Sequence, residues 1–135
     1  MFLILLPINK SKKNMYLVIG FLTGLIIDAF ENSMGLHAFS CVLLMYVKEP
    51  LLLYFVPQLK NKSQQIIPFS LNEYGIPITI FYTCSLVFIH HFTLFLIEAF
   101  RFDLLNILLR TFSSGLVTSV LLIIFHFFNS RNSIK

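Results

Sequence analysis

The segment from Met15 to Ala38 reads MYLVIGFLTGLIIDAFENSMGLHA and carries the clearest structural pattern in the chain. Its first half is an apolar run, which predicts a helix. Gly20, Gly24 and Asp28 recur every four residues, so they lie on one face of that helix. Small residues at this spacing allow two helix backbones in lipid to approach closely. We therefore expect Gly20 and Gly24 to pack against a second helix.

The end of this predicted helix is polar. An acid such as Asp28 near the end of a membrane span has to find a partner, become protonated or reach interfacial water. The residues from Glu31 to Gly35 are polar or small and predict a short reversal of the chain. His37 then lies just inside the next apolar run. The segment thus predicts two helices joined by a tight turn.

The composition is that of an integral membrane protein. Of the 135 residues, 57% are hydrophobic and 12% are charged, and the mean hydropathy is +0.84, which is far more apolar than a soluble domain. Cys41 and Cys84 both fall in apolar runs without metal-like spacing, so we interpret them as small buried thiols rather than a disulfide. The net charge of +4 comes from short basic clusters, which do not form the basic stripe of a nucleic-acid binder.

The apolar runs predict an all-α, polytopic helical bundle. We expect a single transmembrane domain over residues 1–135 with four full spans, at about 15–30, 36–55, 76–100 and 104–128. Residues 1–9 are apolar but too short to cross about 30 Å of hydrocarbon, so they predict a partial helix. Pro50 is expected to kink the second span or to end its regular part.

The basic residues predict an orientation. A polar loop at 57–75 separates the second and third spans, and Arg101-Phe102-Asp103 predicts a tight turn between the last two. Four spans place seven of the ten Lys and Arg residues on the side of the membrane that holds this loop and the C-terminus: Lys10, Lys12, Lys13, Lys60, Lys62, Arg131 and Lys135. The positive-inside rule makes that side cytoplasmic.

Five polar residues are expected to gather in the outer leaflet: Asp28, His37, His91, Glu98 and Arg110. At about 1.5 Å per residue, Arg110 lies roughly 9 Å inside the outer end of the last span. A charge at that depth needs a partner, so we expect an ion pair with Asp28 or Glu98. We favour a structural role for the cluster, fixing helix register. A partner-facing site and proton or solute coupling remain alternatives.

Other polar residues have simpler interpretations. Gly115 with Ser119 predicts a small-residue packing patch on the last helix. Lys48 is expected to extend its side chain to the headgroups as a surface anchor. His90 and His91 with His37 and Asp28 come from scattered positions, which disfavours a zinc site. No nucleophile motif or phosphate-binding loop occurs, so the sequence predicts neither catalysis nor a cofactor.

Several separated segments together resemble one family. The pattern Gly20-x-x-x-Gly24-Leu-x-x-Asp28, followed by Gly35-Leu36-His37-Ala38, is similar to the rod shape-determining protein MreD. The segments His90-His91-Phe92, Leu96-Ile97-Glu98-Ala99-Phe100 and Leu108-Leu109-Arg110 also resemble MreD sequences of the Bacteroidota type. The resemblance covers about residues 2–128, and the chain begins later than such proteins usually do, which implies that an N-terminal membrane segment is missing.

The resemblance implies a function. It suggests a scaffold of the cell-elongation machinery in the bacterial inner membrane, in contact with membrane lipid and an MreC-like membrane protein. Through that partner it would act with MreB filaments and peptidoglycan synthases to regulate cell shape and lateral wall growth. The alternative is a small-solute carrier, such as the membrane substrate-binding subunit of a vitamin importer. A carrier should keep an open polar pocket, whereas a scaffold should bury its polar groups in mutual pairs.

Overall fold

The computed structural model describes residues 2–7, 12–61, 75–99 and 104–132. Within these ranges every regular element is a helix, and no strand occurs. The elements are α1 (Phe2–Leu5), α2 (Lys13–Glu31), α3 (Leu36–Phe55), the 3₁₀ helix η2 (Pro57–Asn61), α5 (Ile76–Glu98) and α6 (Leu104–Asn132). Four of them, α2, α3, α5 and α6, are long and apolar enough to cross a membrane. The all-α bundle with four spans and a partial N-terminal helix is therefore confirmed, and the chain is a multi-pass membrane protein.

The helix boundaries differ from the predicted ones by a few residues. The helix α2 begins at Lys13 instead of Met15, and α6 continues to Asn132, beyond its apolar part. The helix α3 runs through Pro50 to Phe55, so this proline does not end the helix. Most of the predicted polar loop and the predicted turn at 101–103 lie outside the described residues.

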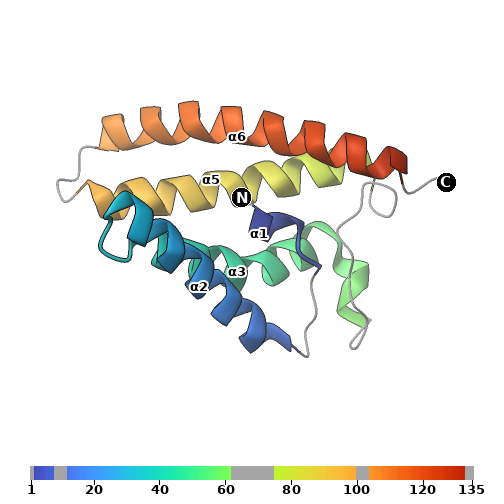
Figure 1. The fold of residues 1–135 in the computed structure, drawn as a ribbon. Helices are drawn as coiled ribbons and strands as arrows, with labels where there is room; N and C mark the ends of the chain where they lie inside the picture. Colours follow the sequence, from blue (N-terminus) through green and yellow to red (C-terminus); the bar gives the residue numbers. More distant parts are fainter. Residues whose placement is uncertain (1, 8–11, 62–74, 100–103, 133–135) are drawn as a thin grey trace.

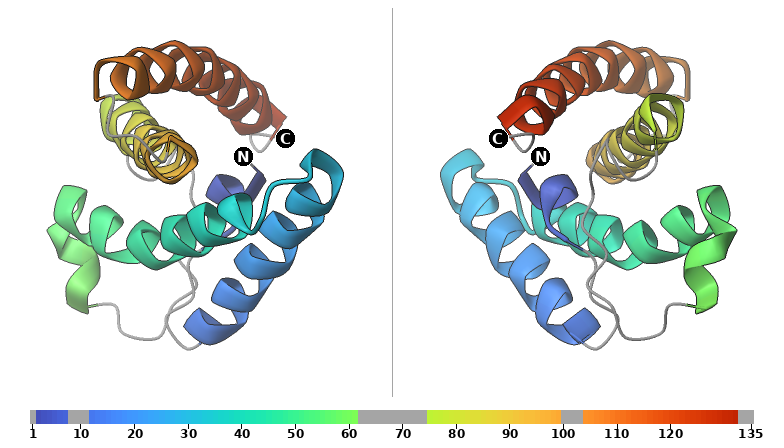
Figure 2. Two further views of the ribbon diagram at one scale, coloured as in Figure 1. Left: turned by 90° about the vertical axis from the view of Figure 1, so that its left-hand side faces the viewer. Right: turned by 90° about the vertical axis from the view of Figure 1, so that its right-hand side faces the viewer.

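The four long helices pack in chain order. Figure 1 shows them running back and forth, so that α2 and α3, α3 and α5, and α5 and α6 are neighbours. The end views in Figure 2 show α2 and α6 at the two limits of this series, with α3 and α5 between them. The turn between α2 and α3 therefore lies at the same end of the molecule as the end of α5 and the start of α6.

The core lies where α3 and α5 face each other. Leu44, Tyr82 and Leu86 are fully buried there, and the hydroxyl of Tyr82 donates a hydrogen bond of 2.9 Å to the backbone carbonyl of Lys48. The short helix α1 adds Leu3 and Ile4 to the same core and contacts α3. The N-terminal segment is thus part of the packed interior.

The outer faces of α2 and α6 are apolar. Large exposed side chains on α6 include Leu105, Phe112, Val117 and Leu121, and α2 exposes a similar series that includes Ile26. A soluble protein does not leave such continuous apolar faces in water. In a membrane, lipid covers them at no cost, because acyl chains are as apolar as the side chains.

Candidate functional site

The contact between α2 and α3 is built on the glycine and aspartate face. Gly20, Gly24 and Asp28 are the buried residues of α2. A Cβ atom added to Gly24 would lie 2.4 Å from the Cα atom of Ala38 and 2.5 Å from the carbonyl oxygen of His37. At Gly20 it would lie 2.8 Å from the Cγ atom of Met45. The glycines thus let α2 lie directly against the backbone of α3.

Asp28 holds the start of α3. Its Oδ1 atom accepts hydrogen bonds from the hydroxyl of Ser33 at 2.7 Å and from the backbone N–H of His37 at 2.9 Å. Its Oδ2 atom accepts one from the backbone N–H of Ala38 at 2.9 Å. The first N–H groups of a helix have no partner within the helix, and the carboxylate supplies one from the neighbouring helix, at the end where negative charge is favoured. Asp28 is buried, and these hydrogen bonds within the protein replace those that its carboxylate would make to water.

The turn between these helices has the backbone that its residues favour. Asn32 and Gly35 have φ angles of 54° and 83°, in the left-handed region, which glycine and asparagine adopt most readily. His37 faces the turn, with its Nδ1 atom 3.1 Å from Oδ1 of Asp28 and its Nε2 atom 3.3 Å from a carboxylate oxygen of Glu31. The imidazole therefore lies between two carboxylates, one buried and one exposed.

A second polar group joins α5 to α6. An Nη atom of Arg110 lies 3.2 Å from a carboxylate oxygen of Glu98, so the ion pair expected of Arg110 forms with Glu98 and not with Asp28. The guanidinium also lies over the ring of Phe95, 4.6 Å from its centroid. Both charged side chains remain about half exposed.

His91 belongs to neither group. Its Nε2 atom lies 3.2 Å from the hydroxyl of Thr118 on α6, and its ring stacks on Phe95 at 5.9 Å. Four of the five residues expected to form one cluster thus lie in two bonded groups at one end of the bundle, Asp28 with His37 and Glu98 with Arg110. The fifth, His91, lies nearer the middle of α5. Among the described residues, no three His, Cys, Asp or Glu side chains are close enough to hold a metal ion.

The packing patch on α6 faces α5. A Cβ atom on Gly115 would lie 3.2 Å from the ring of Phe88. Ser119 is buried, and its hydroxyl makes no hydrogen bond within the described part of the chain. Both residues lie on the inward face of α6.

The expectation that Lys48 reaches the headgroups is wrong. Only 2% of it is exposed, so it is not a surface anchor. Its Nζ atom donates to the backbone carbonyl of Leu3 at 2.9 Å and also to that of Leu6. Leu3 lies within the single turn of α1 and Leu6 directly follows it. The carbonyls of the last turn of a helix have no partner within the helix. A lysine within an apolar span was the available signal, since such residues usually face the interior of the bundle.

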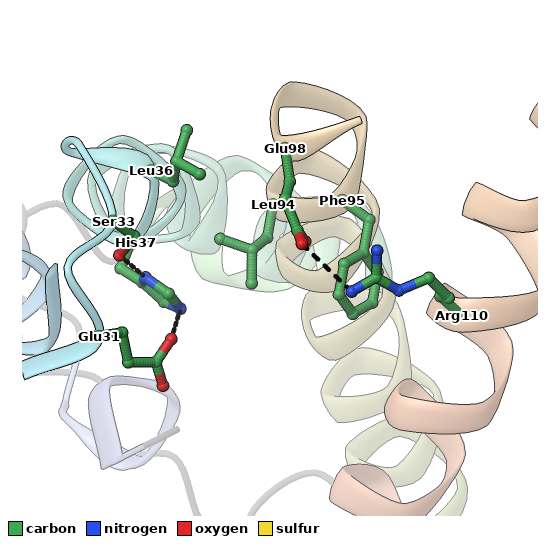
Figure 3. A pocket seen from close by; sticks show the side chains of 8 residues that line it. All are labelled: Glu31, Ser33, Leu36, His37, Leu94, Phe95, Glu98 and Arg110. Atoms are coloured by element: carbon green, nitrogen blue, oxygen red, sulfur yellow. Dashed lines mark hydrogen bonds and ion pairs between the residues drawn. The ribbon is translucent and has the colours of Figure 1, made fainter. Parts of the chain in front are cut away.

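A pocket of about 300 Å³ opens between the two polar groups. Figure 3 shows Glu31, Ser33 and His37 on one side, and Glu98 and Arg110 on the other. The remaining lining residues are apolar: Leu36, Leu94 and Phe95. The pocket therefore offers charges of both signs around a small apolar floor.

Comparison with known proteins adds no further assignment. The chain matches no protein-family model, no curated protein and no solved structure.

Proposed function

We propose that this chain is a non-catalytic membrane scaffold of the bacterial cell-elongation machinery, with a role like that of MreD. In this proposal it resides in the inner membrane and binds an MreC-like membrane protein. Through that protein it acts with MreB filaments and peptidoglycan synthases to regulate cell shape and lateral wall growth. The support is the resemblance of the separated segments described above, together with the four membrane spans.

One observation carries the proposal furthest. The two parts of the resemblance nearest the N-terminus, Gly20 to Asp28 and Gly35 to Ala38, form a single interlocked contact, in which Gly24 and Asp28 both touch Ala38. The carboxylate of Asp28 accepts hydrogen bonds from three groups of the protein, the Ser33 hydroxyl and two backbone N–H groups of α3. A buried carboxylate that is fully occupied in this way favours a structural use of the pattern over binding of a substrate.

The proposed orientation follows the basic residues. Lys12 precedes α2 and Lys13 is its first residue. The start of α2 and the C-terminal ends of α3 and α6 lie at the same end of the molecule (Figure 1). With that end cytoplasmic, the turn at Met34 and the charged pocket face outward.

Capture of the partner tests this proposal. The tagged full chain would be crosslinked in its own growing cells and purified, and MreC would be sought by mass spectrometry. An unrelated polytopic membrane protein, with the same tag and a similar abundance, is the control. Enrichment of MreC over that control is expected. No enrichment at normal abundance of the chain would exclude direct scaffolding through MreC.

The pocket favours a second candidate, a small-solute carrier. Glu31, Glu98 and Arg110 are exposed in the structure, and they surround an open space. A carrier needs such a site. The competition experiment described below tests whether the pocket binds a soluble ligand, as this candidate requires.

A further inference from the structure

The charges around the pocket select its ligand. Glu31 and Glu98 supply two carboxylates, and Arg110 supplies one guanidinium, with His37 beside Glu31. A simple anion would meet two carboxylates, and a simple cation would meet the guanidinium. A molecule that carries an anion and an ammonium group side by side satisfies both signs (Figure 3).

The guanidinium and the carboxylates that line the pocket can form hydrogen bonds to a ligand in addition to those they make within the protein. Arg110 has five N–H donors and bonds to Glu98 through one nitrogen. Guanidinium groups bind phosphate through two parallel hydrogen bonds. The carboxylates can accept hydrogen bonds from an ammonium group, and Leu36, Leu94 and Phe95 would pack against methylene groups between the charges of such a molecule. The volume of about 300 Å³ is at the small end of the usual range for ligand pockets.

A groove lies beyond the pocket, farther along α6. Ser113, Ser114, Val117 and Thr118 line a shallow hollow of about 440 Å³ on this helix. They follow Arg110 by three, four, seven and eight residues, so they lie on the same helical face. At 1.5 Å per residue, the far end of the groove at Thr118 lies about 12 Å along the helix axis from Arg110, toward the middle of the span. An acyl chain attached to a headgroup in the pocket would run in this direction.

We propose that the pocket and groove bind one phospholipid with an amine–phosphate headgroup, phosphatidylethanolamine. The phosphate binds Arg110, the ammonium group binds Glu31 and Glu98, and one acyl chain lies in the groove beside Val117. The pocket lies at an end of the spans, which is the depth of lipid headgroups. This site is independent of the proposed scaffold function, because it requires no protein partner.

Lipid competition tests the site. The purified, delipidated full chain in detergent would be titrated with phosphatidylethanolamine, phosphatidylcholine and phosphatidylglycerol of identical acyl chains, and bound lipid would be counted by native mass spectrometry. Phosphatidylcholine lacks ammonium N–H donors, and phosphatidylglycerol lacks the cation. We expect phosphatidylethanolamine to bind about tenfold more tightly than either, the value of one charged hydrogen bond.

Matched variants locate the site. Arg110→Gln and Glu31→Gln should each remove the preference for phosphatidylethanolamine. If Arg110→Gln does not fold, as judged by its thermal melt, Glu31→Gln serves alone, because its side chain is 60% exposed. Val117→Phe fills the groove and should weaken binding of all three lipids. Leu116→Phe is the control, since Leu116 is an exposed neighbour on α6 outside the groove.

The results of these experiments distinguish a bound phospholipid from a soluble molecule with the same amine–phosphate group. Equal binding of the three lipids, or a preference that survives both charge variants, would overturn the proposal. Soluble phosphoethanolamine should not displace the lipid, because it lacks the acyl chain. Displacement at equal concentration would overturn the lipid assignment and transfer the amine–phosphate chemistry to a solute, as the carrier candidate requires.

Discussion

At the scale of single residues, two buried charged side chains organise the protein by binding backbone groups. Asp28 accepts hydrogen bonds from the first N–H groups of α3, and Lys48 donates to carbonyls at the end of α1. Each charge therefore sits at the helix end of opposite polarity. In lipid, where water does not compete, such bonds replace the solvation that an ionised group loses on burial.

Asp28→Asn is the first residue-scale prediction. The amide keeps one oxygen but places an NH₂ group against an N–H donor of α3, so one donor loses its acceptor. We expect the free energy of unfolding to fall by about 1–3 kcal/mol, read as a lower melting temperature in detergent. Glu31→Gln is the control, because Glu31 is exposed. Equal melting temperatures of the two variants would show that Asp28 does not anchor α3.

Lys48→Met is the second residue-scale prediction. Methionine has a similar length but no donor, so the carbonyls of Leu3 and Leu6 lose their partner. The expected loss is again about 1–3 kcal/mol. Lys13→Met is the matched control, since Lys13 forms a partly exposed pair with Glu49 at 3.6 Å, a type of contact worth about 0–1 kcal/mol. Equal losses of stability in the thermal melts of the two variants would show that the buried hydrogen bonds of Lys48 stabilise the protein no more than the partly exposed pair of Lys13.

At the scale of elements, the sequence predicts contacts best where they are local. The helix pair α2–α3 follows from glycines four residues apart and a polar turn, because the partner helix comes next in the chain. The partners of Lys48 lie 42 and 45 residues away, in a segment too short to span the membrane. The bond of His91 to Thr118 depends on how α6 is rotated against α5. Neither the docking of α1 nor that rotation is encoded in a local pattern.

The two glycines of α2 provide the element-scale prediction. Gly24→Ala should destabilise the protein more than Gly20→Ala, because its new methyl group would overlap backbone atoms of His37 and Ala38. At Gly20 the nearest atom belongs to the side chain of Met45, and the backbone carbonyl of Cys41 is 3.2 Å away. Overpacking of this kind costs about 1–3 kcal/mol. Thermal melts of the two purified variants make the comparison directly. A larger loss for Gly20→Ala would contradict the close approach at Gly24.

At the scale of the whole molecule, the fold places its polar features at opposite ends. The turn between α2 and α3 lies at one end, and the start of α2, which Lys12 precedes, lies at the other (Figure 1). The residues of that turn and the neighbouring ends of α5 and α6 line the charged pocket. Hydropathy alone predicts the four spans that separate these ends. The division of the expected cluster into two pairs around a pocket was not predictable, because it depends on how far apart α3 and α6 are held.

Cysteine labelling tests the proposed orientation. In a chain carrying Cys41→Ala and Cys84→Ala, the variant Met34→Cys should react with a membrane-impermeant maleimide in right-side-out vesicles, since Met34 is fully exposed. Lys12→Cys should react only in inverted vesicles. The reverse pattern would place the pocket on the cytoplasmic side.

Depletion of the chain in its own cells, scored by microscopy, tests the scaffold proposal most directly. A scaffold of cell elongation should be needed for shape, so we predict that depleted cells become wider and round before growth stops. Re-expression of the wild-type chain should restore their shape, and Gly24→Ala should restore it less well. Unchanged cell shape after verified loss of the protein would contradict the proposed function.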